Sequence, residues 1–423
     1  MNSFRLRHLE QALELYHKVA CPTSVSTSSA GSFLLSADPS RFSPPPLSTA
    51  SFPADSLPLD LFLRHYFRCH AKSFTSSDKL FISSHLAQLI KWKGLLDFIT
   101  PPPAAWSSRI RTYFISDRWK LHAQNTRLPP HLRCSFPEPL FARLEAALGT
   151  ATALHVCYTL NEEAPLFLRV NPNRISRDRL LKFLLNKGTS FSPVSTEKCA
   201  HSAYGLVLPQ RQRLSDLPEF QKNYMEIQDE ASQLVALKIN VQPGQKVLDF
   251  CAGSGGKSLA FAPLMENTGR VYLHDVRETL LRHAKKRMRR AGIQNYELIF
   301  PSDAYKFRRL RGSLDWVLCD VPCTATGTLR RNPELKWKYT DERLFELVAL
   351  QREIFRTALQ YMHPTKGRIV YSTASILDEE NVHQVKFLCQ QHGLVLSEPP
   401  FHALPQSKGM DGFFCAIFEK KPE

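Results

Sequence analysis

From about Val241 to the C-terminus, short apolar runs alternate with longer amphipathic segments. Five runs fit strands, namely KVLDFCAG, RVYLHDV, YELIF, LDWVLCDVP and GRIVYSTAS, and a sixth, GFFCAIFEK, closes the chain. Apolar runs of this length match buried strands, and the segments between them have the length and period of helices that cover a sheet. The alternation therefore predicts an α/β domain built on a doubly wound, mostly parallel sheet.

The part of the chain before this sheet has a different organisation. A chain of 423 residues exceeds what one hydrophobic core usually supports, so further domains are expected. Helical periodicity predicts a helical N-terminal domain over residues 1–150, interrupted by a Ser/Pro-rich linker at 21–58. The strand–turn–helix pattern LFLRVNPNRISRDRLLKFLLNKG, followed by AYGLVL, predicts a small α+β domain over 155–225. The sheet domain then occupies 226–423.

The chain is strongly basic, with a formal net charge of +16. The excess peaks in RHAKKRMRR (282–290), in KFRRLR (306–311) and at Arg330-Arg331. A single basic run is usually a solvated helix face. Three such runs within about fifty residues of a basic chain favour a polyanionic partner, and nucleic acid is the obvious one.

Other classes of protein are disfavoured by composition. No apolar run approaches the roughly 20 residues that span a bilayer, and the opening segment lacks the apolar centre of a secretory signal. The ten cysteines form no Cys-x-x-Cys pair, which argues against a zinc site or a disulfide framework. We therefore expect a cytoplasmic, monomeric protein that binds neither a membrane nor a metal.

The first strand of the sheet ends in a glycine-rich turn, LDFCAGSGGKS. A phosphate-binding P-loop would need a glycine at Cys251, and a dinucleotide fingerprint would need a glycine or alanine at Ser258. S-adenosylmethionine, which has no pyrophosphate, is the third ligand that such a turn can hold. A glycine-rich turn alone is a weak signal, so the choice depends on the acidic residues nearby.

Acidic residues stand at three successive strand ends. Asp249 ends the first strand, Asp275 closes the second and Asp303 follows the third. One such residue is more often a helix cap, but three facing one crevice favour S-adenosylmethionine. Asp275 would accept the ribose hydroxyls, Asp303 the adenine amino group, and Lys257 would meet the ligand's carboxylate. The predicted cofactor contacts are Cys251, Ala252, Gly253, Ser254, Gly255, Gly256, Lys257, Asp275, Asp303 and Asp320.

Strand four runs into a segment, CDVPCTATGTLRRNPELKWKY, that holds candidate catalytic residues. Asp320 and Cys323 follow the strand's carboxyl end, beside the cofactor strand. A lone cysteine in an α/β protein is usually a packing residue. Positive charge from Arg330, Arg331 and Lys336 in this segment would lower the thiol's pKa, which favours a reactive thiolate. We therefore predict that Cys323 is functional.

Several segments together resemble the Sun/RsmB/NOP family of RNA 5-methylcytosine methyltransferases. They cover about 160–420 and are IQDEASQLVAL, LDFCAGSGGK, DVPCTATGTLRRNPELKW, YSTAS…EN and GMDGFFCAIFEK. The resemblance implies a seven-stranded Rossmann-like methyltransferase sheet, an RNA-binding small domain and ribosomal or transfer RNA as partner. The helical N-terminal segment is compatible with the family's NusB-like domain. The expected RNA contacts are Arg169, Asn171, Arg330, Arg331 and Lys336.

The resemblance fails at one position that matters for catalysis. Family members use two cysteines; the one in the Pro-Cys motif matches Cys323 and is implied to act in product release. The nucleophile aligns with Ala374, in the turn YSTAS after strand five. A milder departure is AGSGG where the family usually has Ala-Ala-Pro-Gly-Gly.

Three functions remain open at this point. In the first, an active RNA cytosine-C5 methyltransferase, Cys323 attacks C6 of the base and Asp320 holds its amino group or N3. In the second, a catalytically silent relative binds RNA as a ribosome-assembly factor. In the third, a methyltransferase acts on an atom that needs no covalent help.

Overall fold

A computed structural model describes most of the chain. The described residues are 3–20, 58–70, 73–102, 105–115, 118–186, 196–208, 214 and 217–421. The predicted linker at 21–58 lies outside them, apart from Pro58. The chain forms two compact units, a helical unit of residues 1–142 with 332–338 and a sheet unit of residues 143–331 with 339–423.

The helical unit is built from amphipathic helices. They are α1 (Ser3–Ala20), α2 (Leu59–Cys69), α3 (Ser76–Lys91), α4 (Lys93–Ile99), α5 (Trp106–Ile115), α6 (Arg118–Gln124), α7 (Pro130–Arg133) and the start of α8 (Glu138–Leu148). α3 begins with a capping box in which Thr75 and Asp78 satisfy each other's backbone N–H groups. The 3₁₀ helix η3 (Pro333–Lys338) joins this unit, and the Trp337 indole donates to the Ile90 carbonyl at 2.8 Å.

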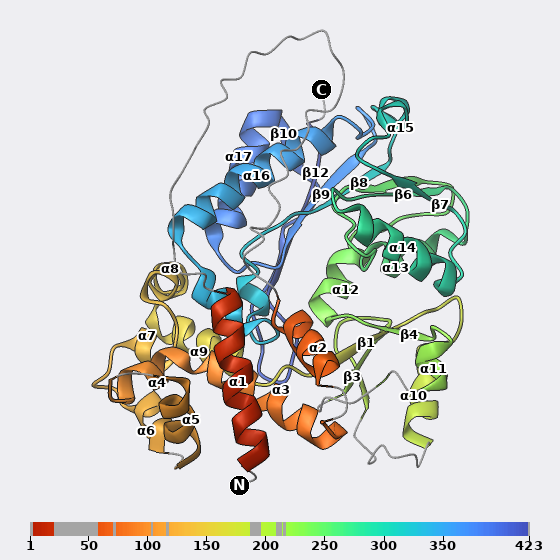
Figure 1. Ribbon diagram of the computed structural model, residues 1–423. Coiled ribbons are helices and arrows are strands. Elements are labelled where there is room, and N and C mark those ends of the chain that lie inside the picture. The colour runs from red at the N-terminus through yellow and green to blue at the C-terminus, as the bar shows by residue number, and fades with distance from the viewer. Residues whose placement is uncertain are drawn as a thin grey trace. The chain divides into compact units, whose positions relative to one another are not determined.

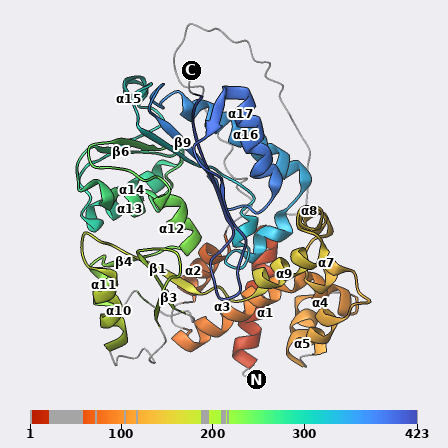
Figure 2. The same ribbon diagram turned by 180° about the vertical axis from the view of Figure 1, so that it is seen from behind.

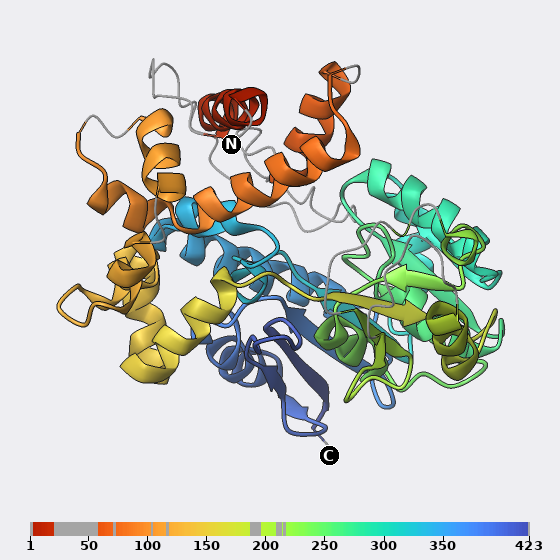
Figure 3. The same ribbon diagram turned by 90° about the horizontal axis from the view of Figure 1, so that it is seen from below.

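A small antiparallel sheet occupies the first part of the sheet unit (Figure 3). Its strand order is β2-β3-β1-β4. The elements are α9 (Thr150–Asn161), β1 (Leu166–Val170), α10 (Arg177–Asn186), β2 (Glu197–Lys198), β3 (Gly205–Leu208), α11 (Pro218–Gln221) and β4 (Met225–Ile227). Leu168 on β1 and Leu180 on α10 share one apolar core with the neighbouring strands, so the helix covers one face of the sheet.

The large sheet carries the predicted α/β alternation. Its strands run in the order β10-β12-β9-β8-β5-β6-β7, and β11 pairs with β12. They are β5 (Lys246–Asp249), β6 (Arg270–His274), β7 (Tyr296–Ile299), β8 (Trp316–Asp320), β9 (Arg368–Thr373), β10 (Leu394–Leu396), β11 (Phe401–Ala403) and β12 (Phe413–Lys420). The order reverses at β5 and β8, which pair in parallel, so the ligand crevice of a doubly wound sheet lies at their carboxyl ends.

Different helices cover the two faces of the large sheet (Figures 1 and 2). Successive residues of a strand point to opposite faces, so Val247 packs into one core and Leu248 into the other. The first core includes α12 (Glu230–Leu237), α13 (Ser258–Phe261) and α14 (Glu278–Ala291), and the second includes α15 (Ala304–Leu310), α16 (Asp341–Leu359) and α17 (Val382–His392). The remaining 3₁₀ helices are η1 (Ala262–Met265), η2 (Thr326–Thr328) and η4 (Asp378–Glu380).

The predicted fold class is confirmed, and the differences are local. Seven strands form the continuous sheet, with β11 as an eighth at its side. Helical structure continues through α9, beyond the expected boundary at residue 150. Its threonines and valine have low helix propensity, and burial of Val156, Cys157 and Leu160 stabilises the helix instead.

Candidate active site

The glycine turn (residues 251–257) follows β5 at the reversal point. Gly253 and Gly255 have φ of +52° and +79°, a left-handed conformation that glycine adopts without strain. The Gly253 N–H donates to Asp275 Oδ2 at 2.8 Å, which joins the turn to the end of β6. A Cβ placed on Gly256 would meet no atom within 4 Å. The turn therefore leaves open space where a ligand can approach its backbone.

Two buried carboxylates stand behind this turn. Asp249 Oδ2 accepts from the Ser258 hydroxyl at 2.7 Å, whereas its Oδ1 has no hydrogen-bond partner among the described residues. Burial raises the pKa of Asp249 to about 7. Burial acts in the same direction on Asp275, but hydrogen bonds from Arg277 and Gly253 outweigh it and lower the pKa of that carboxyl. At neutral pH Asp275 is an ionised acceptor, while Asp249 can take or release a proton.

The other predicted cofactor contacts differ in their surroundings. Asp303 precedes α15, and its Oδ2 accepts from the Phe300 N–H at 3.0 Å. Lys257 was assigned to the ligand's carboxylate, but its ammonium is paired with Asp320 at 2.5 Å. The second oxygen of Asp320 accepts from the Ser372 hydroxyl at 2.8 Å. Lys257 thus connects the glycine turn to the predicted catalytic acid.

These groups fit the requirements of S-adenosylmethionine. The unpartnered Oδ1 of Asp249 suits the cationic end of the ligand, because a buried acceptor gains most from a charged donor. Asp275 already accepts from Gly253 and Arg277, and Asp303 from the Phe300 N–H, so their assignment to the ribose hydroxyls and the adenine amino group stays a prediction. The open space at Gly256 suits a ligand that lies against the backbone.

The loops after β8 and β9 lie side by side. The two strands pair in parallel, with Asp320 opposite Ser372. Beyond the strands, the Gly327 N–H donates to the Ala374 carbonyl at 2.9 Å. The Cys323 sulfur accepts hydrogen bonds from the backbone N–H groups of Ala325 and Ala374. The only candidate thiol in this loop therefore lies against the turn that carries Ala374.

The electrostatic reason for a reactive Cys323 was wrong. Burial raises the pKa of this thiol, and the Glu380 carboxylate raises it further, while the two backbone N–H groups act in the opposite direction. Arg330 and Arg331 form ion pairs with Asp411 instead. In the protein without bound RNA, Cys323 is therefore a neutral thiol at physiological pH.

Glu380 is the site residue that sequence reasoning missed. Its Oε1 accepts from the Thr324 N–H and from the Gln351 amide, both at 2.9 Å, and its Oε2 accepts from the Thr324 hydroxyl at 2.5 Å. The Tyr371 hydroxyl donates to its carbonyl at 2.7 Å. Glu380 thereby holds the Cys323 loop against β9 and α16. The sequence signals were the run of acids after the strand-five turn, which reads equally well as a helix start, and the final EN of the family segment YSTAS…EN, which includes Glu380.

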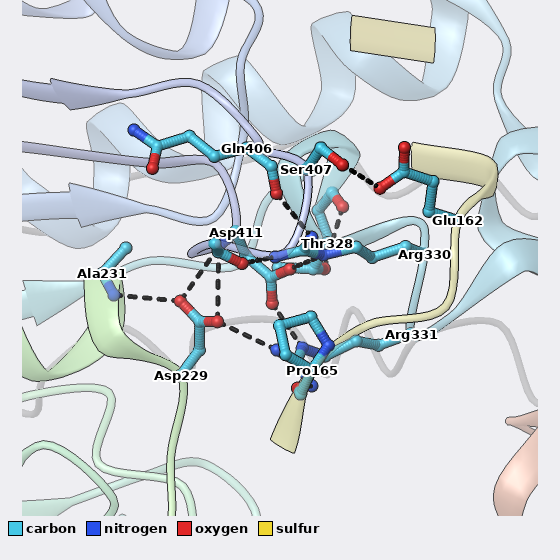
Figure 4. A network of polar contacts seen from close by, with 12 residues as sticks. Glu162, Pro165, Asp229, Ala231, Thr328, Arg330, Arg331, Gln406, Ser407 and Asp411 are labelled. Carbon is cyan, nitrogen blue, oxygen red and sulfur yellow. Dashed lines mark hydrogen bonds and ion pairs between the residues drawn. The ribbon is translucent and has the colours of Figure 1, made fainter. Parts of the chain in front are cut away.

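The predicted RNA contacts are engaged with protein groups. Arg330 is buried and donates to the Gln406 carbonyl at 2.9 Å, and Arg331 donates to Asp229 at 2.9 Å and to the Pro165 carbonyl at 3.2 Å (Figure 4). In the helical unit, the buried Lys336 ammonium donates to the Lys91 carbonyl at 2.6 Å. These three side chains hold loops in place, and burial or pairing removes the accessibility that a direct RNA contact requires.

The two predicted contacts on the small sheet are also buried. Asn171 donates to the carbonyls of Asn223 and Ala291, at 3.2 and 3.0 Å. Arg169 donates to the carbonyl of Gly256 in the glycine turn at 2.9 Å. Both residues therefore join the small sheet to the large one.

Metal and membrane features were also sought in the described residues. No group of three or more His, Cys, Asp or Glu side chains there is placed to hold a metal ion. Among the described helices, none combines the length and apolar character of a bilayer span.

The large sheet is mostly parallel, reverses its strand order between β5 and β8, and contains the antiparallel strand β12. Together with the glycine turn and the acidic residues beside it, this arrangement defines the Rossmann-like methyltransferase fold. Solved structures agree on this fold. A methyltransferase homologue from Pyrococcus horikoshii covers 69% of this chain and 98% of its own, with a TM-score of 0.59 and 25% identity. NSun6 from the same organism, crystallised with SFG, covers 68% of this chain and 99% of its own, with a TM-score of 0.61 and 21% identity.

Comparisons with family models and with individual relatives show which family of methyltransferases the chain resembles. The model of the 16S rRNA methyltransferase RsmB/F matches residues 236–419, and that of the RsmF/B-like ferredoxin-like domain matches 136–214. A probable ribosomal RNA small subunit methyltransferase B from Synechocystis is 30% identical over 68% of this chain and 67% of its own. The Vibrio cholerae methyltransferase B is 32% identical over 62% of this chain and 60% of its own. The chain belongs to the RsmB/F family of ribosomal RNA methyltransferases.

Proposed function

We propose that this protein is an S-adenosylmethionine-dependent methyltransferase that modifies C5 of a cytosine in ribosomal RNA, with Cys323 as the nucleophile. The observation that carries the proposal is the position of Cys323. Its sulfur belongs to the loop after β8 and lies against the backbone of Ala374, near Asp320. The names of the bacterial relatives support ribosomal RNA as the substrate, with transfer RNA as the other candidate.

The chemistry explains why a thiol is needed. C5 of cytosine is a weak nucleophile, and addition of a thiolate at C6 forms an S–C6 bond that makes C5 enamine-like. S-adenosylmethionine, when bound, supplies an electrophilic methyl group. After methyl transfer to C5, a general base removes the C5 proton, and the electron pair of that bond re-forms the C5–C6 double bond and expels Cys323 from C6 as a thiolate. Asp320, held by Lys257 and Ser372, would accept from the exocyclic amino group of a base splayed out of its stack.

The backbone around Cys323 can favour its thiolate in the complex. Ala325 has a φ of +55°, an unusual value for a residue with a Cβ, and its N–H donates to the sulfur. The Ala374 N–H is the second donor. Hydrogen bonds to the ionised form stabilise it, so these two groups offset part of the effect of burial.

One observation favours a second candidate, the catalytically silent RNA-binding relative. Burial and Glu380 keep Cys323 protonated, and Ala374 has no reactive atom. A trapping experiment separates the two candidates. RNA containing 5-fluorocytidine is incubated with the protein and S-adenosylmethionine, and because fluorine at C5 cannot leave as a proton, the adduct persists. We expect a protein–RNA adduct that survives denaturation and maps to Cys323 by mass spectrometry.

Variants complete this test. Cys323→Ala should abolish both the adduct and turnover on unmodified RNA, whereas Cys389→Ala, on α17, serves as the matched cysteine control and should retain both. Ala374→Cys in the Cys323→Ala background should restore the adduct if only the position of the thiol has moved. Turnover without an adduct in Cys323→Ala would identify a different target atom. No turnover on any RNA, with S-adenosylmethionine bound, would identify the silent relative.

A further inference from the structure

The glycine turn is held from outside by two arginines. Arg169 Nη1 donates to the Gly256 carbonyl at 2.9 Å. Arg287, on α14, donates from Nη1 to both the carbonyl and the hydroxyl of Ser254, each at 2.8 Å. The turn contains two left-handed glycines. Arginine side chains fix its Ser254 and Gly256 carbonyls, in addition to the hydrogen bonds within the turn.

Both arginines are connected to the small sheet. Arg169 belongs to β1 and lies in register with Glu226 on β4. Glu226 accepts from Arg287 Nη2 at 2.9 Å, and Arg169 also donates to the side chain of Gln228. The Gln228 amide in turn contacts the Gly256 carbonyl at 3.4 Å. Arg169 and Gln228 thus contact the glycine turn directly, and Glu226 contacts it through Arg287.

The burial of Arg169 makes these bonds costly to break. Arg169 is only 5% exposed. Burial lowers the pKa of its guanidinium to about 10, so the group remains charged at neutral pH. A buried charge is tolerated only while its donors are hydrogen-bonded. Movement of the small sheet away from the turn would therefore leave the buried guanidinium without one of its acceptors, the Gly256 carbonyl.

We propose that Arg169 and Arg287 are positioning residues that couple the small domain to the cofactor site. If RNA binds the small domain, it holds β1 and β4 in place, and through Arg169 and Arg287 it holds the glycine turn in its binding conformation. Cofactor and RNA should then strengthen each other's binding by the same factor, as thermodynamic linkage requires. This inference rests on the proposed function, because it assumes that both ligands bind.

The alternative is that the arginines only attach one sheet to the other. Arg174 provides the matched control, because it is an arginine just beyond β1 that contacts the large-sheet part of the molecule at α14, where it donates to the Arg290 carbonyl at 3.4 Å. Its contact is remote from the glycine turn. A merely structural role predicts the same result for Arg169 and Arg174, whereas positioning of the turn does not.

The test measures the affinity for S-adenosylhomocysteine by calorimetry, with and without a saturating mixed-sequence single-stranded RNA. In the wild-type protein, RNA should tighten binding several-fold. Arg169→Met should weaken binding about tenfold without RNA, in line with the loss of a charge-assisted hydrogen bond, and RNA should no longer tighten it. Arg169→Lys, which keeps the charge and one donor, should lie between the two. Arg174→Met should behave as the wild type.

Thermal melting of each variant separates folding from positioning. Should Arg169→Met fail to melt cooperatively, Arg287→Lys is measured in its place, because it removes one of the two bonds to Ser254 and keeps the charge. Equal losses in the Arg169 and Arg174 variants, or an unchanged effect of RNA in Arg169→Met, would overturn the inference. Absence of S-adenosylhomocysteine binding by the wild type would instead overturn the proposed cofactor.

Discussion

The two sides of the crevice satisfy their buried polar groups differently. On the cofactor side, formed by the loops after β5 and β6, the buried Asp249 has one oxygen without a hydrogen-bond partner among the described residues. On the reaction side, formed by the loops after β8 and β9, the equally buried Glu380 accepts three hydrogen bonds with its two oxygens. Both carboxyls have a pKa raised by burial, but only Glu380 is fully engaged by the protein.

This difference shows what each side is built to do. An unsatisfied buried acceptor costs about 1–3 kcal/mol, and a ligand that donates to it recovers that cost as binding free energy. If the proposed cofactor donates to Asp249 Oδ1, its binding recovers this cost. On the reaction side, the network instead fixes the backbone at Cys323 and Ala374, so the thiol's surroundings are set before any substrate arrives.

The largest expected effect comes from breaking the network on the reaction side. Glu380→Ala leaves the Thr324 N–H, the Thr324 hydroxyl and the Gln351 amide without their acceptor. Because the Cys323 loop is then free to move, we expect turnover and adduct formation to fall by more than about 100-fold. S-adenosylhomocysteine affinity should change less than about threefold, since the cofactor side does not depend on this network.

Two controls test the independence of the two sides. Glu380→Gln retains one acceptor oxygen and should recover part of the activity. Asp378→Ala, on the same 3₁₀ helix, should leave turnover close to that of the wild type. A parallel loss of S-adenosylhomocysteine affinity in Glu380→Ala would show that the crevice behaves as one unit and that its two sides are not independent.

The two sides of the crevice should respond differently to pH. We expect the affinity for S-adenosylhomocysteine to report on the cofactor side and turnover to report on the reaction side. With a pKa of about 7, the ionised fraction of Asp249 rises from about a tenth at pH 6 to about nine-tenths at pH 8. If ionised Asp249 accepts from the ligand's ammonium, affinity for S-adenosylhomocysteine rises about tenfold over this range. Turnover should continue to rise above pH 8, because the pKa of the Cys323 thiol is raised.

Asp249→Asn checks the assignment in two ways. It should bind S-adenosylhomocysteine more weakly and without this pH dependence. It should also change stability with pH, because a carboxyl whose folded pKa is raised keeps a proton that the unfolded chain has released. The free energy of unfolding of the wild type therefore falls as pH rises from about 4 to 7, and Asp249→Asn should lack that decrease. Wild-type affinity that is constant from pH 6 to 8 would remove Asp249 from the site.

The sequence predicted the large sheet and the acids at its strand ends, because period and position along a strand are local properties. It could not predict which charged side chains pair with one another. The charges of Arg330 and Arg331 were expected to activate Cys323, yet their acceptor Asp411 lies 80 residues away in the chain. For the same reason, the basic run 282–290 concealed the single residue, Arg287, that contacts the glycine turn. Side-chain partners of this kind become visible only when the fold brings distant segments together.

The smallest expected effect concerns where RNA charge is neutralised. Arg289 and Arg290 are exposed at the end of α14, the helix whose Arg287 contacts the glycine turn, whereas Arg330 and Arg331 on the reaction side are already paired. Each phosphate contact to single-stranded RNA contributes about 0.7 to the slope of log affinity against log salt. Replacing Arg289 and Arg290 by Ala should therefore lower that slope by about 1.4, or about sevenfold in affinity across a fourfold change in salt.

The matched control replaces two exposed arginines on α16, which covers the opposite face of the sheet. Arg343→Ala with Arg356→Ala removes the same charge, but these side chains are paired with Glu346 and Glu353. If RNA binds at Arg289 and Arg290, the control variant keeps the wild-type slope of log affinity against log salt. The reason is that net charge alone does not set the number of phosphate contacts. Equal slopes in both double variants would mean that the run 282–290 is a solvated helix face, and that the cofactor side holds the cofactor without guiding the RNA.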